Sequence, residues 1–317
     1  MWIATNWKDY KVLDTSAGEK LERWGNYTLV RPDPQVIWNT PKILQGWKKP
    51  NAHYHRSSKG GGEWEFFDLP EEWDISYELE IGKTLTFGLK PFNFKHTGLF
   101  PEQAVNWEWF SKLIANETAK RGAERETVQS ANQVADQSFI QMTSSKIKVL
   151  NLFAYTGGAT LVAAAAGAQV THVDASKGMV SWAKENASKS GLQDKPIRWL
   201  VDDCMKFVLR EIRRGNHYDA IIMDPPSYGR GPKGEIWKIE DAIFPLIENC
   251  VQLLSDKPLF FLVNSYTTGL QSSVLTYMLS FALSKKFGGN VKSCEIGLPV
   301  EDTTFVLPCG SSGRWMA

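Results

Sequence analysis

The chain has 317 residues, of which 43% are hydrophobic and 22% are charged, and these values exclude a disordered chain and a fibrous repeat. Lysine and arginine number 36 against 35 acidic residues, so the net charge of +1 cannot by itself attract a polyanion, and any nucleic-acid contact must be local. The length suits one large domain plus a smaller one.

Neither a leader nor a membrane segment is expected. The first eight residues lack a charged start followed by an apolar stretch, and no run of about 18 apolar residues occurs. The cysteines stand far apart with no Cys-x-x-Cys pair, which argues against a zinc site and a disulfide framework. We therefore expect a soluble, cytoplasmic protein that binds neither a membrane nor a metal.

Residues 1–92 predict a small β-rich domain, because Trp, Pro and Gly are frequent and short alternating stretches such as 27–30 and 84–87 lie between turn formers. This domain could bind substrate or RNA. Residues 42–59 contain no acid and interleave basic with aromatic residues, a composition that allows phosphate contact and base stacking together. We expect Lys48, Lys49 and Arg56 to contact RNA; a solvated basic loop is the alternative.

Residues 93–317 predict a second domain, which opens with an amphipathic helix over 101–121 and continues through a polar helix or surface loop to 146. From Ile147 onward, short apolar runs alternate with helix-length segments, a pattern typical of βαβ units and a parallel sheet. In such a Rossmann-like α/β fold, ligands bind beyond the carboxyl ends of the strands. The predicted strands are 147–153, 169–174, 196–201, 217–223, 258–264, 291–297 and 303–308, and the predicted helices between them are 157–167, 177–190, 203–214, 238–255 and 270–286.

The first of these strands turns through a glycine-containing loop into an Ala-rich helix. The loop reads Phe153-Ala154-Tyr155-Thr156-Gly157-Gly158, and glycine there lets the backbone turn tightly and approach a ligand. A dinucleotide-binding turn needs Gly-x-Gly-x-x-Gly, which is absent, so a ligand without a pyrophosphate is favoured. A plain strand-to-helix turn is the alternative.

Acidic residues end the next two strands. Asp174 follows Gly157 at nearly the distance of roughly 20 positions that is expected for a carboxylate that accepts hydrogen bonds from ribose hydroxyls. Asp202 and Asp203 end the third strand, where one could accept a hydrogen bond from an adenine amino group, and we expect Asp203 because it opens the next helix. Capping of the following helix is the alternative for Asp174 and for Asp203.

The fourth strand runs into Asp224-Pro225-Pro226-Ser227-Tyr228-Gly229, the most specific motif in the chain. Two prolines fix the backbone and remove two amide donors, leaving the Pro225 carbonyl and the Asp224 carboxylate as acceptors that can converge. Such acceptors suit a substrate amino group, whose lone pair they would turn toward an electrophilic methyl group. Tyr228 could stack on a base. Alternatively, the prolines merely end the strand.

Together these segments resemble the class I S-adenosylmethionine-dependent methyltransferases related to bacterial large-subunit (23S) ribosomal RNA methyltransferases. The resemblance covers about residues 93–317, and Thr97–Gln103 is similar to a Gly-x-Phe-x-Asp-Gln stretch that precedes the domain in that group. It implies a seven-stranded class I sheet, with the glycine loop at the methionine part of S-adenosylmethionine, Asp174 at the ribose and Asp203 at the adenine. The implied cofactor-binding residues are Phe153, Ala154, Tyr155, Thr156, Gly157, Gly158, Asp174, Ala175, Asp202, Asp203, Cys204 and Asp224; the implied catalytic residues are Asp224, Pro225, Pro226 and Tyr228, with Ser227 and Tyr228 at the methyl acceptor.

The predicted function is therefore methyl transfer to an amino nitrogen of an RNA base, with ribosomal RNA as the partner. Members that make 5-methylcytosine attack the base with a cysteine, and the corresponding positions here are Pro225-Pro226 and Asn264-Ser265-Tyr266, which argues against that chemistry. Three alternatives stay open: a small-molecule or protein acceptor, a nicotinamide-dependent oxidoreductase on the same sheet topology, and a non-catalytic adenosyl-binding scaffold.

Overall fold

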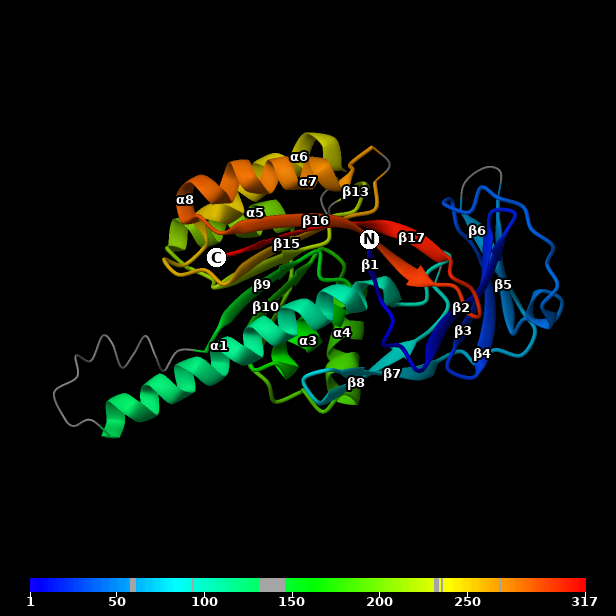
Figure 1. Cartoon of the computed structure of the whole chain (residues 1–317), viewed down its shortest axis with the longest axis horizontal. Coiled ribbons are helices and arrows are strands. Elements are labelled where there is room, and N and C mark those ends of the chain that lie inside the picture. Colours follow the sequence, from blue (N-terminus) through cyan, green and yellow to red (C-terminus); the bar gives the residue numbers. More distant parts are fainter. Residues whose placement is uncertain (58–60, 93, 131–145, 231–233, 235, 268) are drawn as a thin grey trace.

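The computed structural model describes residues 1–57, 61–92, 94–130, 146–230, 234, 236–267 and 269–317 (Figure 1). Its centre is an eight-stranded sheet in the order β1-β16-β17-β15-β12-β9-β10-β11, in which β17 runs antiparallel to both of its neighbours. The α/β prediction with a β-rich N-terminal part is confirmed. The strands of this sheet are β1 (Trp2–Ile3), β9 (Lys148–Leu152), β10 (Gln169–Asp174), β11 (Ile197–Val201), β12 (Ala220–Met223), β15 (Phe260–Ser265), β16 (Asn290–Pro299) and β17 (Val306–Met316).

All seven predicted strands are present, and two features of the sheet differ from the prediction. The eighth strand is β1, which pairs parallel to β16 through only two residues, too few to leave a pattern in the sequence. The strand predicted at 303–308 is β17, which begins at Val306 and extends to Met316. It continues because residues 311–316 pair with β15, although Gly310, Ser311, Ser312 and Gly313 show no apolar alternation.

Alternate side chains of the central strands enter two cores on opposite faces of the sheet, as the period of two in a strand requires. Val149 and Ile222 pack with helices α1 and α3, whereas Leu150 and Ile221 pack with α5, α6 and α7. Figure 1 shows these helices in two layers around the sheet. The helices are α1 (Ala104–Ser130), α3 (Gly158–Ala165), α4 (Lys177–Lys189), α5 (Cys204–Arg214), α6 (Ile239–Gln252), α7 (Ser272–Leu279) and α8 (Lys285–Phe287), with a π-helical segment Ser280–Ser284 between the last two.

Helix α1 is longer than predicted, and the rest of the predicted polar segment, 131–145, lies outside the described residues. A short hairpin of β13 (Tyr228–Arg230) and β14 (Ile236–Lys238) follows the double proline and was not predicted. No helix in the described part of the chain has both the length and the apolar character needed to cross a membrane.

The N-terminal part forms two further sheets. Aromatic side chains join it to the rest of the molecule: the Trp7 ring lies 4.5 Å from that of Tyr77 and 6.0 Å from that of Trp107 on α1. One core therefore continues from the N-terminal part to one face of the central sheet. The five-stranded sheet contains β2 (Tyr10–Ser16), β3 (Glu19–Trp24), β4 (Tyr27–Pro32), β5 (Ala52–Arg56) and β6 (Gly62–Phe66), and the two-stranded sheet contains β7 (Trp73–Leu79) and β8 (Lys83–Leu89).

Candidate active site

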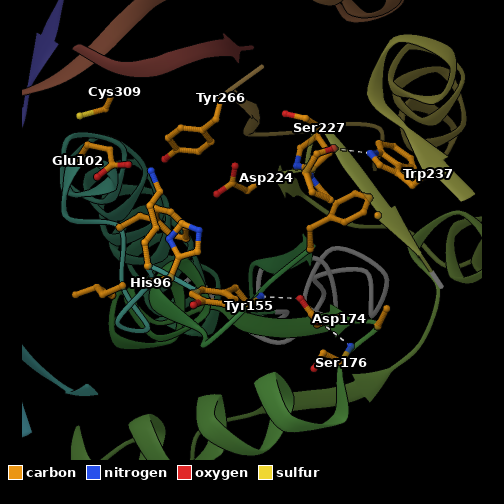
Figure 2. A pocket seen from close by; sticks show the side chains of 18 of the residues that line it. His96, Glu102, Tyr155, Asp174, Ser176, Asp224, Ser227, Trp237, Tyr266 and Cys309 are labelled. Atoms are coloured by element: carbon orange, nitrogen blue, oxygen red, sulfur yellow. Dashed lines mark hydrogen bonds between the residues drawn. The ribbon is translucent and has the colours of Figure 1, made fainter. Parts of the chain in front are cut away.

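A cavity of about 750 Å³ lies at the carboxyl ends of the parallel strands (Figure 2). Its walls come from the loops after β9, β10, β12 and β15, from the start of α5, and from the N-terminal sheet. Pockets of about 300–1,000 Å³ are typical of small-molecule and cofactor sites. The predicted site residues that line it are Phe153, Tyr155, Asp174, Ala175, Asp203, Cys204, Asp224, Pro225, Pro226 and Ser227.

The other predicted site residues lie elsewhere. Ala154, Thr156 and Gly158 line a small adjoining pocket that also reaches Asp224. The side chain of Tyr228 is 52% exposed on β13 and lines neither pocket, whereas its chain neighbours Ser227 and Gly229 line the cavity. Gly157 and Asp202 also line neither pocket, and Lys48, Lys49 and Arg56 are exposed on the N-terminal part, outside the cavity.

The loop after β9 adopts unusual backbone angles and is held by Asp174. Phe153 and Tyr155 have φ values of 55° and 51°, in the left-handed region that non-glycine residues rarely adopt. The backbone N–H of Tyr155 donates to Oδ2 of Asp174 (2.9 Å), and that of Ser176 donates to Oδ1 (2.8 Å). Burial raises the pKa of Asp174, and these two bonds oppose that shift. Strain of this kind persists where the surroundings enforce it, commonly at functional sites.

Glycine is required at position 157, where φ is +90° and a Cβ would meet the Cβ of Ala183 at 2.9 Å. We expect Gly157→Ala to lower the free energy of unfolding by about 1–3 kcal/mol, measured by urea denaturation. Gly191→Ala is the matched control, because Gly191 also has a positive φ (+66°) but open space around it. Equal losses in the two variants would contradict the close packing inferred for Gly157.

The aspartates after β11 have distinct partners. Asp203 Oδ1 accepts a hydrogen bond from the backbone N–H of Lys206 (2.8 Å), so Asp203 caps α5 while also lining the cavity. Asp202 Oδ1 accepts from the backbone N–H of Asp203, and its other oxygen pairs with Arg210, which holds its carboxylate away from the cavity. The cap of α4 is Ser176, not Asp174.

Asp224 presents an oxygen that no described residue satisfies. Its side chain is half-buried, and its Oδ1 is a buried atom without a hydrogen-bond partner among the residues that the structure describes. Burial and the nearby carboxyl of Glu102 raise the pKa of Asp224 to about 7. The carbonyl of Pro226 accepts a hydrogen bond from Trp237 Nε1 (2.6 Å), which fixes the double-proline turn against β14.

Glu102 and Tyr266 complete the wall around Asp224 and were not assigned roles from the sequence, although both stand in segments singled out there. Gln103 Nε2 donates to the Tyr266 hydroxyl (2.6 Å), and a buried amide network extends from Gln103 to Asn106 and Asn264. The stretch before α1 is thereby tied to the end of β15. The remaining unpredicted lining side chains with ionisable groups are Lys20, Arg31, Asp33, Lys95, His96 and Cys309.

Known proteins of similar sequence and structure are methyltransferases, which agrees with the position of the cavity at the carboxyl ends of the strands. Residues 120–237 match the family described as S-adenosylmethionine-dependent methyltransferase. The crystal structure of the SAM-dependent methyltransferase from Agrobacterium tumefaciens is 36% identical, with a TM-score of 0.82, over 97% of this chain and 90% of that one.

Two curated relatives match over shorter segments. Ribosomal RNA large subunit methyltransferase K/L of Shewanella baltica (strain OS155) is 38% identical over 110 residues, covering 34% of this chain and 15% of the relative. Ribosomal RNA large subunit methyltransferase K of Neisseria meningitidis serogroup B is 31% identical over 140 residues, covering 44% of this chain and 38% of the relative. The chain thus spans well under half the length of these two relatives.

Proposed function

The chain belongs to the S-adenosylmethionine-dependent methyltransferases, and from this membership we propose that it transfers the methyl group of S-adenosylmethionine to an amino nitrogen of an RNA base. The membership confirms the resemblance seen in the sequence and removes the nicotinamide-dependent alternative. One observation carries the choice of acceptor: Oδ1 of Asp224 lies at the cavity without a hydrogen-bond partner among the described residues. A buried acceptor without a donor is costly, and an amino group of a ligand would supply that donor.

The cavity suits the proposed cofactor. Asp174 lies on the cavity wall, and its carboxylate already fixes the loop that continues into the small adjoining pocket. A carboxylate that still has lone pairs available can also accept hydrogen bonds from ribose hydroxyls. We propose that Asp174 holds the ribose, that Asp203 faces the adenine, and that residues 153–158 border the methionine part.

In the proposed mechanism, the protein positions the acceptor amino group against the methyl group of S-adenosylmethionine. When bound, S-adenosylmethionine supplies an electrophilic methyl group. The carboxylate of Asp224 and the carbonyl of Pro225 would accept the two amino hydrogens, which turns the nitrogen lone pair toward that methyl. Asp224 would then accept the proton that the nitrogen loses after methylation, and a pKa of about 7 suits this exchange.

The names of the two curated relatives favour ribosomal RNA as the acceptor, and an enzyme for ribosomal RNA would work in the cytoplasm. The test is transfer of a labelled methyl group by the full chain to separate pools of ribosomal RNA, total protein and small metabolites. We expect label in the RNA pool, on an exocyclic amino group after nucleoside digestion. Label only in protein or metabolites would refute the RNA assignment, and label in no pool would favour a non-catalytic scaffold.

The rate of methyl transfer should depend on pH through the protonation of the Asp224 carboxylate. Only the carboxylate form can accept both an amino hydrogen and the departing proton, so kcat/KM should fall about tenfold per pH unit below pH 7 and level off above it. Asp224→Asn should remove this acidic limb, because an amide oxygen still accepts a hydrogen bond but does not titrate. Initial rates from pH 5.5 to 9 test this; an unchanged acidic limb in Asp224→Asn would assign the titration to another group.

A further inference from the structure

The N-terminal sheet contributes a cationic wall to the cavity, formed by Lys20 on β3, Arg31 on β4 and Lys95 on the segment after β8. These three side chains come from segments far apart in the sequence, and the proposed methyl transfer uses none of them. The side chain of Arg31 is 5% exposed and that of Lys20 is 13% exposed. Charged groups are rarely buried to this degree unless they are paired or functional.

Two of these cations have carboxylate partners. Arg31 Nε lies 2.6 Å from Glu22 Oε2, and Lys20 Nζ lies 3.5 Å from Glu22 Oε1 and 3.3 Å from Asp33 Oδ2. Lys95 differs: its Nζ donates to the carbonyl of Pro32 (3.0 Å), and it forms no ion pair with any residue that the structure describes. Burial, together with Lys20 and Arg31, lowers the pKa of Lys95 to about 8, although the nearby carboxylates of Asp33 and Glu22 oppose this shift. An anion beside Lys95 would supply the missing partner.

The cationic wall lies close to Glu102 and to Tyr155, because Lys20 influences the pKa of Glu102 and Arg31 influences that of Tyr155. Glu102 is near enough to influence both Asp224 and Lys20 electrostatically. In Figure 2, Glu102 and Cys309 lie to the left of Asp224, whereas Asp174 and Ser176 lie below it and to the right. Because the wall belongs to the N-terminal sheet, we assign an anion there to the molecule that approaches Asp224 from that sheet, and the titration below separates this source from the carboxylate of the cofactor.

We propose that Lys95, flanked by Lys20 and Arg31, binds a phosphate group of the nucleotide whose base is methylated. This inference rests on the proposed function, because it takes the acceptor to be RNA. Lys20 and Arg31 are already paired with Glu22 and Asp33, so the ammonium of Lys95 is the group left to pair with a phosphate. The N-terminal sheet would then select the acceptor from inside the cavity rather than through the exposed run at Lys48, Lys49 and Arg56.

The test uses the full chain saturated with S-adenosylhomocysteine, titrated calorimetrically with each of the four ribonucleoside 5′-monophosphates and with the matching nucleosides. We expect at least one monophosphate to bind about tenfold or more tightly than its nucleoside. Lys95→Gln should abolish that difference and leave the Kd of the nucleoside and of S-adenosylhomocysteine unchanged. Lys83→Gln is the matched control, because Lys83 is exposed on β8 and outside the cavity, and it should retain the difference.

Three results would overturn the proposal. The first is that no monophosphate binds more tightly than its nucleoside, and the second is that Lys95→Gln keeps the difference in affinity between the two. The third is that Lys95→Gln binds S-adenosylhomocysteine itself more weakly than the parent chain does. The last result would assign the anion to the carboxylate of the cofactor. Thermal unfolding of each variant excludes a folding defect. Because the titration needs no methyl transfer, the two failures are distinguishable: a chain that methylates no RNA but shows the Lys95-dependent difference would refute the proposed function and the RNA source of the phosphate, and would leave only a nucleotide-phosphate site at Lys95.

Discussion

Asp224→Ala should lower kcat for methyl transfer by about 10²- to 10³-fold, the range for removing one preorganised catalytic hydrogen-bonding group. Alanine removes both the acceptor that orients the amino group and the base that takes its proton, while the Pro225 carbonyl alone cannot fix the lone pair. Single-turnover transfer of labelled methyl to ribosomal RNA at pH 8 measures the chemical step.

Two controls isolate the role of this carboxylate. Asp256→Ala removes an exposed aspartate outside the cavity and should leave the rate unchanged. Asp224→Asn keeps one acceptor oxygen and should lose less activity than Asp224→Ala. Removal of Asp224 also removes a buried oxygen that no residue in the described ranges satisfies, so Asp224→Ala should fold at least as stably as the parent chain. Near-normal transfer by Asp224→Ala would refute the mechanism.

Asp174→Ala should raise the Kd for S-adenosylmethionine by about 10- to 100-fold, because hydrogen bonds to a charged group contribute on the order of 1.5–3 kcal/mol. The variant would lose the proposed ribose contact and also the acceptor for the Tyr155 N–H, which holds the strained loop in place. Calorimetric titration with S-adenosylmethionine measures the change in affinity.

Asp194→Ala is the control for this variant, because Asp194 is exposed between α4 and β11 and should leave cofactor affinity unchanged. Asp174→Asn retains one acceptor oxygen, so it should bind the cofactor with an affinity between those of the parent and Asp174→Ala. An Asp174→Ala protein that binds S-adenosylmethionine as tightly as the parent would show that the ribose lies elsewhere.

Local patterns in the sequence predicted the elements that build the carboxyl edge of the sheet. The strand predicted at 169–174 is β10 with the same limits, and Asp174 stands at its end as expected. Such runs are recognisable because both faces of the central strands are buried, so their apolar residues are nearly continuous. The double proline likewise marked the turn after β12, since proline cannot continue a central strand.

Features that depend on long-range packing were not predicted. Lys20 and Arg31 enter the cavity only because the N-terminal sheet packs beside it, and no spacing in the sequence indicates this. Tyr228 stands in a hairpin of β13 and β14 that was not predicted, because its strands are only three residues each; its role at the methyl acceptor stays a prediction. Lys48, Lys49 and Arg56 are exposed outside the cavity, and their contact with RNA stays a prediction.

A crystal structure of the full chain with S-adenosylhomocysteine bound would test the central claim most directly. The proposed site predicts the adenosine between Asp174 and Asp203 and the sulfur atom facing the turn at Asp224 and Pro225. A ligand seated outside this cavity, or a sulfur atom directed away from Asp224, would contradict it.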